Sequence, residues 1–177
     1  KQELAIDFED VLLLTAAMLE EERTVRERVQ DQYRYFTIDE YQDISPLQQS
    51  LLETWLGDRE ELCVVGDPRQ TIYTFAGADP SFLTGFSNRF PSAQFVELNR
   101  NYRSSPEIVA LANRVAEHGE LEAVRQFSSK PSLERFSSAT AEAKWIAERV
   151  SEAVQGGQPL GEIAVLARIN SQLEQVE

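Results

Sequence analysis

Two adjacent carboxylates, Asp39 and Glu40, directly follow an apolar run in the stretch FTIDEYQD, residues 36–43. The run is rich in strand-forming residues, so it predicts a short buried strand that ends at the acidic pair. Two acids at the end of a buried strand are unfavourable unless a cation lies beside them and compensates their charge. The pattern is typical of a Walker B element, in which one carboxylate binds Mg²⁺ and the other accepts a proton from water. A helix cap or a solvated strand end is the alternative interpretation.

A second candidate stretch is GDPRQTIYTFAGA, residues 66–78, which follows another apolar run. Gln70 could orient water or contact a phosphate, as amides do in phosphoryl transfer. Tyr73 and Phe75 lie two residues apart and could stack on unpaired bases. The alternative is that both aromatic residues belong to the core, where aromatic side chains are common.

A third candidate stretch is NRNYRSSPE, residues 99–107. Arg103 lies just before a Ser-Pro helix start, where a guanidinium can approach phosphate oxygens. Tyr102 could stack on a purine. The alternative is that these arginines solvate a surface loop.

The elements that must position these residues alternate along the chain. Hydrophobic periodicity and capping residues predict helices at 7–29, 45–57, 79–86, 104–115 and 140–157, and a further helix start at Asn170. Runs of strand-forming residues predict strands at 33–39, 61–67, 93–98 and 162–169. The signal is weak over 117–138, which is expected to be loop with short strands. The alternation predicts an α/β fold with a mostly parallel sheet covered on both faces.

Ligands of such sheets bind beyond the carboxyl ends of the strands. Asp39, Glu40, Gly66 and Asp67 all lie at predicted strand ends, so the sequence predicts that they share one site.

Composition limits the classes of protein that fit. The chain has 177 residues, 42% of them hydrophobic, and a net charge of −13, which argues against a general polyanion binder. Its one cysteine, Cys63, excludes an internal disulfide and is expected to be buried in a strand. Neither a membrane-spanning run nor a signal-peptide pattern occurs, and a cytoplasmic protein is expected. The chain begins without methionine, which suggests a piece of a larger protein.

Taken together, IDEYQD, VVGDPRQTIYTFAGA and LNRNYRSSPEIVALAN resemble the UvrD/Rep/PcrA family of superfamily-one DNA helicases. The resemblance covers nearly the whole chain. It implies an α/β fold of the P-loop NTPase type, with RecA-like parallel sheets flanked by helices. It also implies parts of two motor lobes: residues 1–97 would be the C-terminal part of the first, with the junction to its inserted subdomain, and 98–177 would start the second.

The resemblance implies a role for each residue of the nucleotide site. Asp39 looks like the magnesium-binding carboxylate and Glu40 like the general base that activates water. Gln42 matches a position that couples nucleotide to DNA, and Gln70 matches the glutamine that contacts the γ-phosphate region. ATP and Mg²⁺ are the implied cofactors.

The resemblance also implies contacts from the remaining motifs. Tyr73 and Phe75 match aromatic residues that stack on single-stranded bases, Tyr102 matches a residue that stacks on adenine, and Arg103 resembles an arginine finger. The implied function is an ATP-dependent 3′–5′ DNA helicase that unwinds duplex DNA, in DNA repair, with single-stranded and duplex DNA as partners and no membrane.

The sequence departs from the family pattern in two places. No G-x-x-x-x-G-K-[ST] occurs, so the Walker A phosphate cradle and its lysine are missing, as are the family's later motifs. The chain alone is therefore not expected to hydrolyse ATP. Ala76 stands where arginine is common in the family, so the contact to DNA or the coupling contact that the resemblance implies for that arginine is not expected here.

Three alternatives stay open at this point. The chain could be the motor part of a RecB/AddA-like helicase–nuclease, or a non-catalytic single-stranded-DNA-binding module on a helicase scaffold. It could also be a metal-dependent hydrolase that uses Asp39, Glu40, Asp43 and Asp67.

Overall fold

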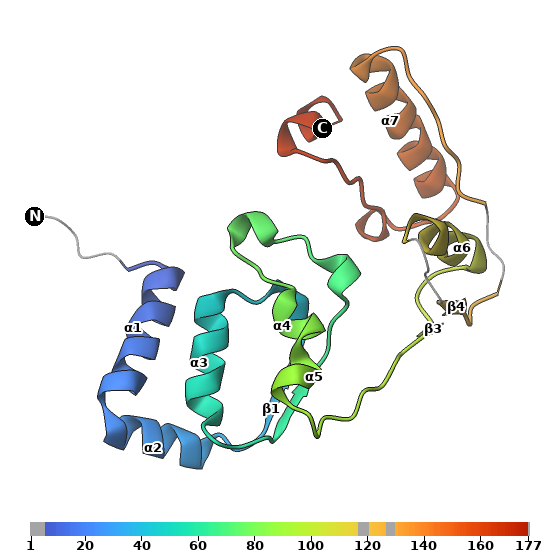
Figure 1. Ribbon diagram of the computed structural model, residues 1–177. Coiled ribbons are helices and arrows are strands. Elements are labelled where there is room, and N and C mark those ends of the chain that lie inside the picture. The colour runs from blue at the N-terminus through green and yellow to red at the C-terminus, as the bar shows by residue number, and fades with distance from the viewer. Residues whose placement is uncertain (1–5, 117–120, 127–129, 177) are drawn as a thin grey trace, which may run out of the picture. The chain divides into compact units, whose positions relative to one another are not determined.

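The computed structural model describes residues 6–116, 121–126 and 130–176. The chain divides into two compact units, Lys1–Leu98 and Asn99–Glu177. Each unit combines helices with one two-stranded parallel sheet (Figure 1). The predicted α/β class and the parallel pairing are confirmed, but on a smaller scale than one extended sheet.

The first unit contains helices that pack beside a short strand pair. Its helices and strands are α1 (Phe8–Glu21), α2 (Arg23–Gln32), β1 (Phe36–Ile38), α3 (Pro46–Leu56), β2 (Leu62–Val64), α4 (Ser81–Thr84) and α5 (Phe86–Arg89). Three single-turn 3₁₀ segments, Tyr41–Asp43, Pro68–Gln70 and Thr74–Ala76, lie in the loops after the strands. These loops carry most of the candidate site residues.

The single helix predicted at 7–29 is two helices, with a break at Glu22. The backbone of Glu22 leaves the helical region, at φ −102° and ψ 88°. The guanidinium of Arg26 donates to the carbonyls of Leu19 and Glu20, at 3.0 and 3.1 Å, and so satisfies the open end of α1.

Helix α3 begins and ends where its sequence predicts. Ser45 and Gln48 form a capping box, Pro46 takes the first position, and Gly57 follows the last turn with φ 63°. Arg59 donates to the carbonyls of Trp55 and Leu56, and to Gln30 of α2, which fixes α2 against α3.

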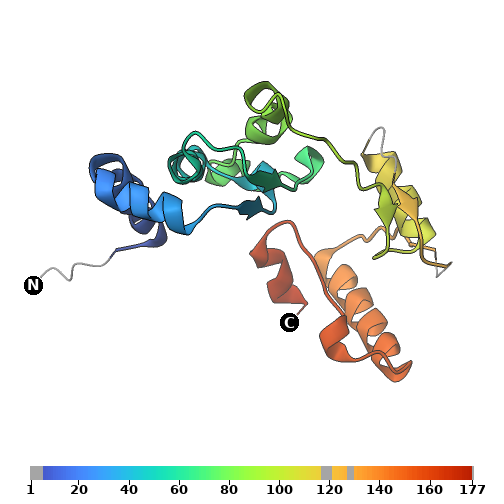
Figure 2. The same cartoon turned by 90° about the horizontal axis from the view of Figure 1, so that it is seen from below.

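The core of the first unit lies between α1 and α3, which run side by side in Figures 1 and 2. Its buried members are Ala16, Leu19 and Leu51, with Leu12, Val25, Val29, Leu47 and Trp55 packed around them. Trp55 also stacks on Tyr33 and Phe36, with ring centroids 6.3 and 6.2 Å apart. These contacts join the helices to the start of β1.

Strands β1 and β2 are parallel, with Phe36 opposite Leu62 and Ile38 opposite Val64. The prediction that Cys63 is buried is wrong: Cys63 is exposed. It pairs with Thr37 on the same face of the sheet, and Thr37 is exposed as well. Within the described residues, therefore, the sheet is covered on one face only.

The prediction of a strand at 93–98 is wrong, because these residues pair with neither β1 nor β2. Phe95, Val96 and Leu98 are exposed, with Phe95 at 81%. A run of strand-forming residues becomes a strand only when a neighbouring backbone offers hydrogen bonds, and no described strand lies beside this segment.

The second unit contains β3 (Arg100–Asn101), α6 (Pro106–Val115), β4 (Glu122–Ala123) and α7 (Ala139–Gln155), followed by 3₁₀ segments Leu160–Glu162 and Asn170–Gln175. Strands β3 and β4 are parallel, and β4 falls in the segment of weak sequence signal, where residues 117–120 and 127–129 lie outside the described residues. The prediction of a strand at 162–169 is wrong, because these residues, like 93–98, have no described strand beside them to pair with. Leu166 in this run is exposed. The helix predicted from Asn170 is a short 3₁₀ segment.

Among the described residues, none of the helices has the length and apolar character that crossing a bilayer requires.

Candidate active site

The carboxyl ends of β1 and β2 bring the first two candidate stretches together. The backbone N–H of Val65 donates to Ile38, at 2.8 Å, and that of Tyr41 donates to Val65, at 2.9 Å. Asp39 and Glu40 follow β1, while Gly66 and Asp67 follow β2. Parallel register therefore places the acidic pair beside the loop that carries Gln70, as the sequence predicts.

Glu40 has a backbone conformation that non-glycine residues rarely adopt. Its φ is 51° and its ψ is 41°, and it is the only described non-glycine residue with positive φ. Such a conformation costs about 1–3 kcal/mol and persists only when surrounding contacts hold it. The backbone N–H of Asp43 donates to the carbonyl of Glu40, at 2.9 Å, which closes the turn. The side chain of Glu40 is exposed, as is that of Asp39.

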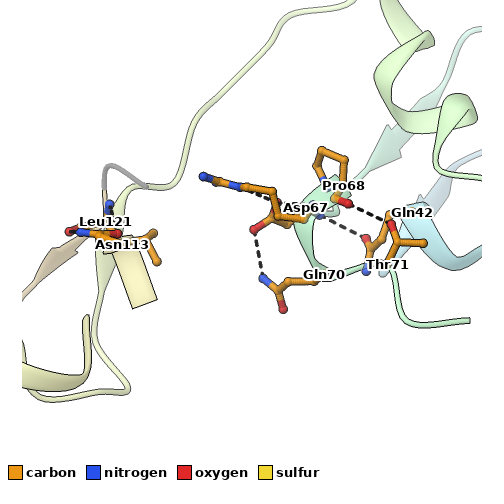
Figure 3. A network of polar contacts seen from close by, with 8 residues as sticks. Gln42, Asp67, Pro68, Gln70, Thr71, Asn113 and Leu121 are labelled. Atoms are coloured by element: carbon orange, nitrogen blue, oxygen red, sulfur yellow. Dashed lines mark hydrogen bonds and ion pairs between the residues drawn. The ribbon is translucent and has the colours of Figure 1, made fainter. Parts of the chain in front are cut away.

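Gln42 connects the two strand ends through its side chain. Its amide Nε2 donates to Glu40 Oε2, at 2.7 Å, and its Oε1 accepts from the backbone N–H of Asp67, at 3.1 Å. The residue has no exposed surface. Figure 3 shows the side chain of Gln42 reaching the backbone at Asp67.

Gly66 is required by the same contact. A Cβ added to Gly66 would lie 2.5 Å from Gln42 Oε1 and 3.2 Å from the backbone nitrogen of Tyr41. Only glycine leaves room for the glutamine at this point.

Asp67 fixes the shape of the loop that carries Gln70. Its Oδ1 accepts from the backbone N–H and the Nε of Arg69, at 3.0 and 3.1 Å, and its Oδ2 accepts from Gln70 Nε2, at 3.2 Å (Figure 3). Partial burial alone would raise the pKa of Asp67, but the hydrogen bonds from Arg69 and Gln70 outweigh it and hold the pKa below its ordinary value. Asp67 is thus an ionised anchor for Gln70.

Tyr73 and Phe75 lie at the surface, so the interpretation that they are core residues is wrong. Phe75 is 86% exposed and Tyr73 is 50% exposed, with ring centroids 6.1 Å apart. The start of their loop is held by Asp43, whose Oδ1 accepts from the backbone N–H of Ile72, at 3.3 Å. Two adjacent exposed rings form a surface on which flat ligands can stack.

Tyr102 and Arg103 lie in the second unit, in the turn between β3 and α6. Asn101 Oδ1 accepts from the backbone N–H groups of Arg103 and Ser104, at 3.0 and 2.8 Å. Arg125, which follows β4, donates to the carbonyl of Arg103, at 2.7 Å. Both candidate side chains are exposed on a turn whose backbone is fixed from two sides.

Sequence reasoning missed several residues that shape these sites. Gly66 and Asp67 were expected at the strand end, but not as a close-packing position and a loop anchor. Asn101 has a local signal, because asparagine side chains commonly accept hydrogen bonds from the backbone N–H groups that follow them in a turn. Arg125 has none, because its partner is distant in sequence.

No group of three or more His, Cys, Asp or Glu residues that could hold a metal ion occurs in the described part of the chain. Asp39, Glu40, Asp43 and Asp67, all of them described, therefore do not form such a group. This does not bear on Mg²⁺ bound together with a nucleotide, because that ion commonly takes one or two carboxylates and completes its shell with phosphate oxygens and water. Asp39, exposed at the strand end, fits that arrangement.

Parallel strands that end in an acidic pair beside a glutamine-bearing loop define an α/β protein with a polar site at the carboxyl edge of its sheet. Comparison with known families matches residues 1–91 to the UvrD/REP helicase N-terminal domain and residues 96–177 to the UvrD-like helicase C-terminal domain. The chain belongs to the UvrD/REP helicase family, whose domains have a P-loop NTPase-like α/β fold.

Curated relatives agree with the family. The chain is 48% identical to the ATP-dependent DNA helicase UvrD2 of Mycobacterium tuberculosis, over 97% of this chain and 26% of that protein. It is 33% identical to the putative ATP-dependent DNA helicase YjcD of Bacillus subtilis, over 97% of this chain and 23% of the relative. It is 30% identical to the ATP-dependent DNA helicase PcrA of Staphylococcus epidermidis, over 98% and 25%. The chain thus spans about a quarter of the length of these relatives.

Proposed function

We propose that the chain is part of an ATP-dependent DNA helicase that moves 3′ to 5′ and couples Mg-ATP hydrolysis to the unwinding of duplex DNA. The observation that supports this most is the acidic pair at the end of β1, with Glu40 tied by Gln42 to the loop of Gln70. The names of the relatives support the reaction class. DNA repair in the cytoplasm is the proposed setting.

Glu40 is the proposed general base. Gln42 holds Oε2 of its carboxylate, so Oε1 is the oxygen proposed to accept a proton from the water that attacks the γ-phosphorus. The bond from the γ-phosphorus to the β–γ bridging oxygen breaks as the new oxygen–phosphorus bond forms, giving ADP and phosphate. Gln70 would orient that water or contact the γ-phosphate, with Asp67 fixing its side chain.

Asp39 is the proposed ligand of Mg²⁺, directly or through water. A bound Mg²⁺ would neutralise charge on the phosphate oxygens. Asp39 Oδ1 also accepts from the backbone N–H of Glu40, at 2.9 Å, which orients the carboxylate of Asp39.

Contacts with DNA are proposed for the exposed ring pair. Tyr73 and Phe75 would stack on successive unpaired bases, a contact that tolerates any sequence because every base has a flat face. The path from these rings to Glu40 runs through Ile72, Asp43 and the turn of Glu40. Gln42 provides a second connection, because its side chain bonds both the carboxylate of Glu40 and the backbone of Asp67. A shift of the loop on DNA would therefore move Glu40, the proposed general base. This is the proposed coupling.

The second unit is proposed as the start of the second RecA-like lobe, and the first unit as part of the first lobe with the junction to its inserted subdomain. Tyr102 would stack on adenine, and Arg103 would reach the γ-phosphate as an arginine finger. The turn fixed by Asn101 and Arg125 suits such a role, because a backbone that is already ordered loses less freedom when the Arg103 side chain binds phosphate.

Turnover is proposed for the whole protein, because the sequence of this chain contains no Walker A motif. The test is Glu40→Gln in the whole protein, which removes the negative charge and keeps the shape of the side chain. We expect nucleotide affinity to be retained and DNA-stimulated ATP turnover to fall by roughly 10²–10⁴-fold.

Glu61→Gln is the matched control, because Glu61 is an exposed glutamate at the opposite end of the strand pair. It should leave turnover unchanged. Equal turnover in the wild-type and Glu40→Gln proteins would overturn the assignment of the base.

A further inference from the structure

A ring of contacts closes around Tyr41, the residue that follows the proposed base. The hydroxyl of Tyr41 donates to Gln49 Oε1, at 2.7 Å, and Gln49 Nε2 donates to Glu53 Oε1, at 2.6 Å. Glu53 forms an ion pair with Arg89 of α5. Helix α5 returns to Tyr41 through Phe86, whose ring meets the tyrosine ring edge-on, with centroids 5.8 Å apart. We name Gln49, Glu53 and Arg89 the relay.

The relay is buried where it meets Tyr41 and reaches the surface at its far end. Tyr41 and Gln49 are 1% and 4% exposed, whereas the ion pair of Glu53 with Arg89 is partly exposed. Removing a partner from the buried end would leave a polar atom unsatisfied, which is costly away from water. The hydroxyl of Tyr41 is therefore tied firmly to α3 and, through Glu53, to α5.

The position of Tyr41 matters because of the residue before it. Glu40 has the one positive φ among the described non-glycine residues, and its carboxylate and carbonyl accept hydrogen bonds from Gln42 and Asp43, which follow it in the turn. A residue held in this way relaxes unless the residues on each side are fixed. On one side, β1 is fixed by its pairing with β2; on the other side, Tyr41 is fixed by its backbone bond to Val65 and by the relay.

We infer that the relay is a positioning device for the proposed catalytic base: by fixing Tyr41, Gln49, Glu53 and Arg89 hold the left-handed turn that presents the carboxylate of Glu40. This inference rests on the proposed function of Glu40. It assigns α5, which carries no proposed catalytic residue, a role in turnover. It also gives the two neighbouring glutamines of α3 different roles, because Gln48 caps the helix and Gln49 joins the relay.

Amide hydrogen exchange on this chain tests the relay without reference to ATP. Gln49→Met keeps the volume of the side chain and removes both of its hydrogen bonds. We expect the amide of Asp43, which is bonded to Glu40, to exchange about tenfold faster or more, while the amide of Phe36 at the far end of β1 changes little. An equal acceleration of both amides would show general destabilisation and would overturn the relay.

Leu51→Ala is the matched control, because it weakens the core between α1 and α3 from the same helix without touching the relay. It should accelerate both amides by the same factor. If Gln49→Met does not fold, Arg89→Met tests the same point from the partly exposed end, where a substitution is better tolerated.

Kinetics of the whole protein test the link to turnover. Arg89→Met should lower kcat by about tenfold and leave the KM for ATP unchanged, and Arg89→Lys, which keeps the ion pair, should restore most of kcat. A kcat unchanged in Arg89→Met would overturn the positioning role. If Glu40→Gln also leaves kcat unchanged, the base assignment fails, whereas the exchange rates still report whether the relay holds the turn.

Discussion

Gln42→Met is the substitution whose consequence follows most directly from the structure. Methionine matches glutamine in length and flexibility, so the change removes the amide without opening a large cavity. Three hydrogen bonds are lost: the amide nitrogen donates to the carboxylates of Glu40 and, at 3.4 Å, Asp43, and the amide oxygen accepts from the backbone N–H of Asp67. A hydrogen bond to a charged group contributes about 1.5–3 kcal/mol, and an unsatisfied buried N–H costs about 1–3 kcal/mol.

Part of this loss is recovered, because methionine has less polar surface to remove from water. We therefore expect Gln42→Met to lower the free energy of unfolding of the first unit by about 2–4 kcal/mol. Urea denaturation, followed by fluorescence, measures the change. The chain has two tryptophans, Trp55 in the first unit and Trp145 in the second, so a Trp145→Phe background leaves Trp55 as the reporter of the unit in question.

Gln32→Met is the matched control, since Gln32 is exposed at the end of α2 and should change stability by no more than about 0.5 kcal/mol. The reasoning is refuted if Gln42→Met changes the unfolding midpoint no more than this control. That result would mean that the amide of Gln42 does not hold the two strand ends together in solution.

Three further predictions concern the same edge of the sheet. Gly66→Ala should destabilise the first unit by about 1–3 kcal/mol in urea denaturation, because its Cβ would displace the amide of Gln42; a neutral effect would contradict the close approach. The pKa of Asp67 is lowered in the folded state, so its contribution to stability is present above the ordinary aspartate pKa of about 4 and is lost as the pH falls through the folded value. Asp67→Asn should reduce the dependence of unfolding midpoint on pH in that acid range, and an unchanged dependence would disprove the anchor. Phe75→Ala should weaken single-stranded DNA binding by the whole protein by about 1–3 kcal/mol with little change in Tm, since the ring is exposed; unchanged affinity in a fluorescence titration would remove Phe75 from the DNA contact.

Local sequence signals predicted the parts of the fold that local chemistry decides. The capping box at Ser45 with Pro46, and the turn at Gly57, gave α3 its limits, because these groups satisfy helix ends wherever the chain goes. The apolar runs before Asp39 and Gly66 predicted two parallel strands with polar residues at one edge. The helix that was expected through Glu22 is interrupted, because Arg26 bonds to carbonyls that a longer helix would use.

Features that depend on distant partners could not be predicted. Phe95 and Leu166 lie in strand-like runs, but no described strand pairs with either run, so neither forms a strand. Gln42 was expected at the site, yet its complete burial depends on Gly66 and Asp67, which lie some two dozen residues along the chain. The left-handed turn at Glu40 gives no signal in composition or periodicity, because it arises from contacts made by its neighbours.

The central claim is that Glu40 removes a proton from water during hydrolysis of a nucleotide at this sheet edge. The most direct measurement is single-turnover hydrolysis of ATP already bound to the whole protein with DNA, because it isolates the chemical step from binding and release. The account predicts that Glu40→Gln slows this step by roughly 10²–10⁴-fold while ATP affinity stays near that of the wild-type protein. A rate of hydrolysis equal to that of the Glu61→Gln control would contradict it.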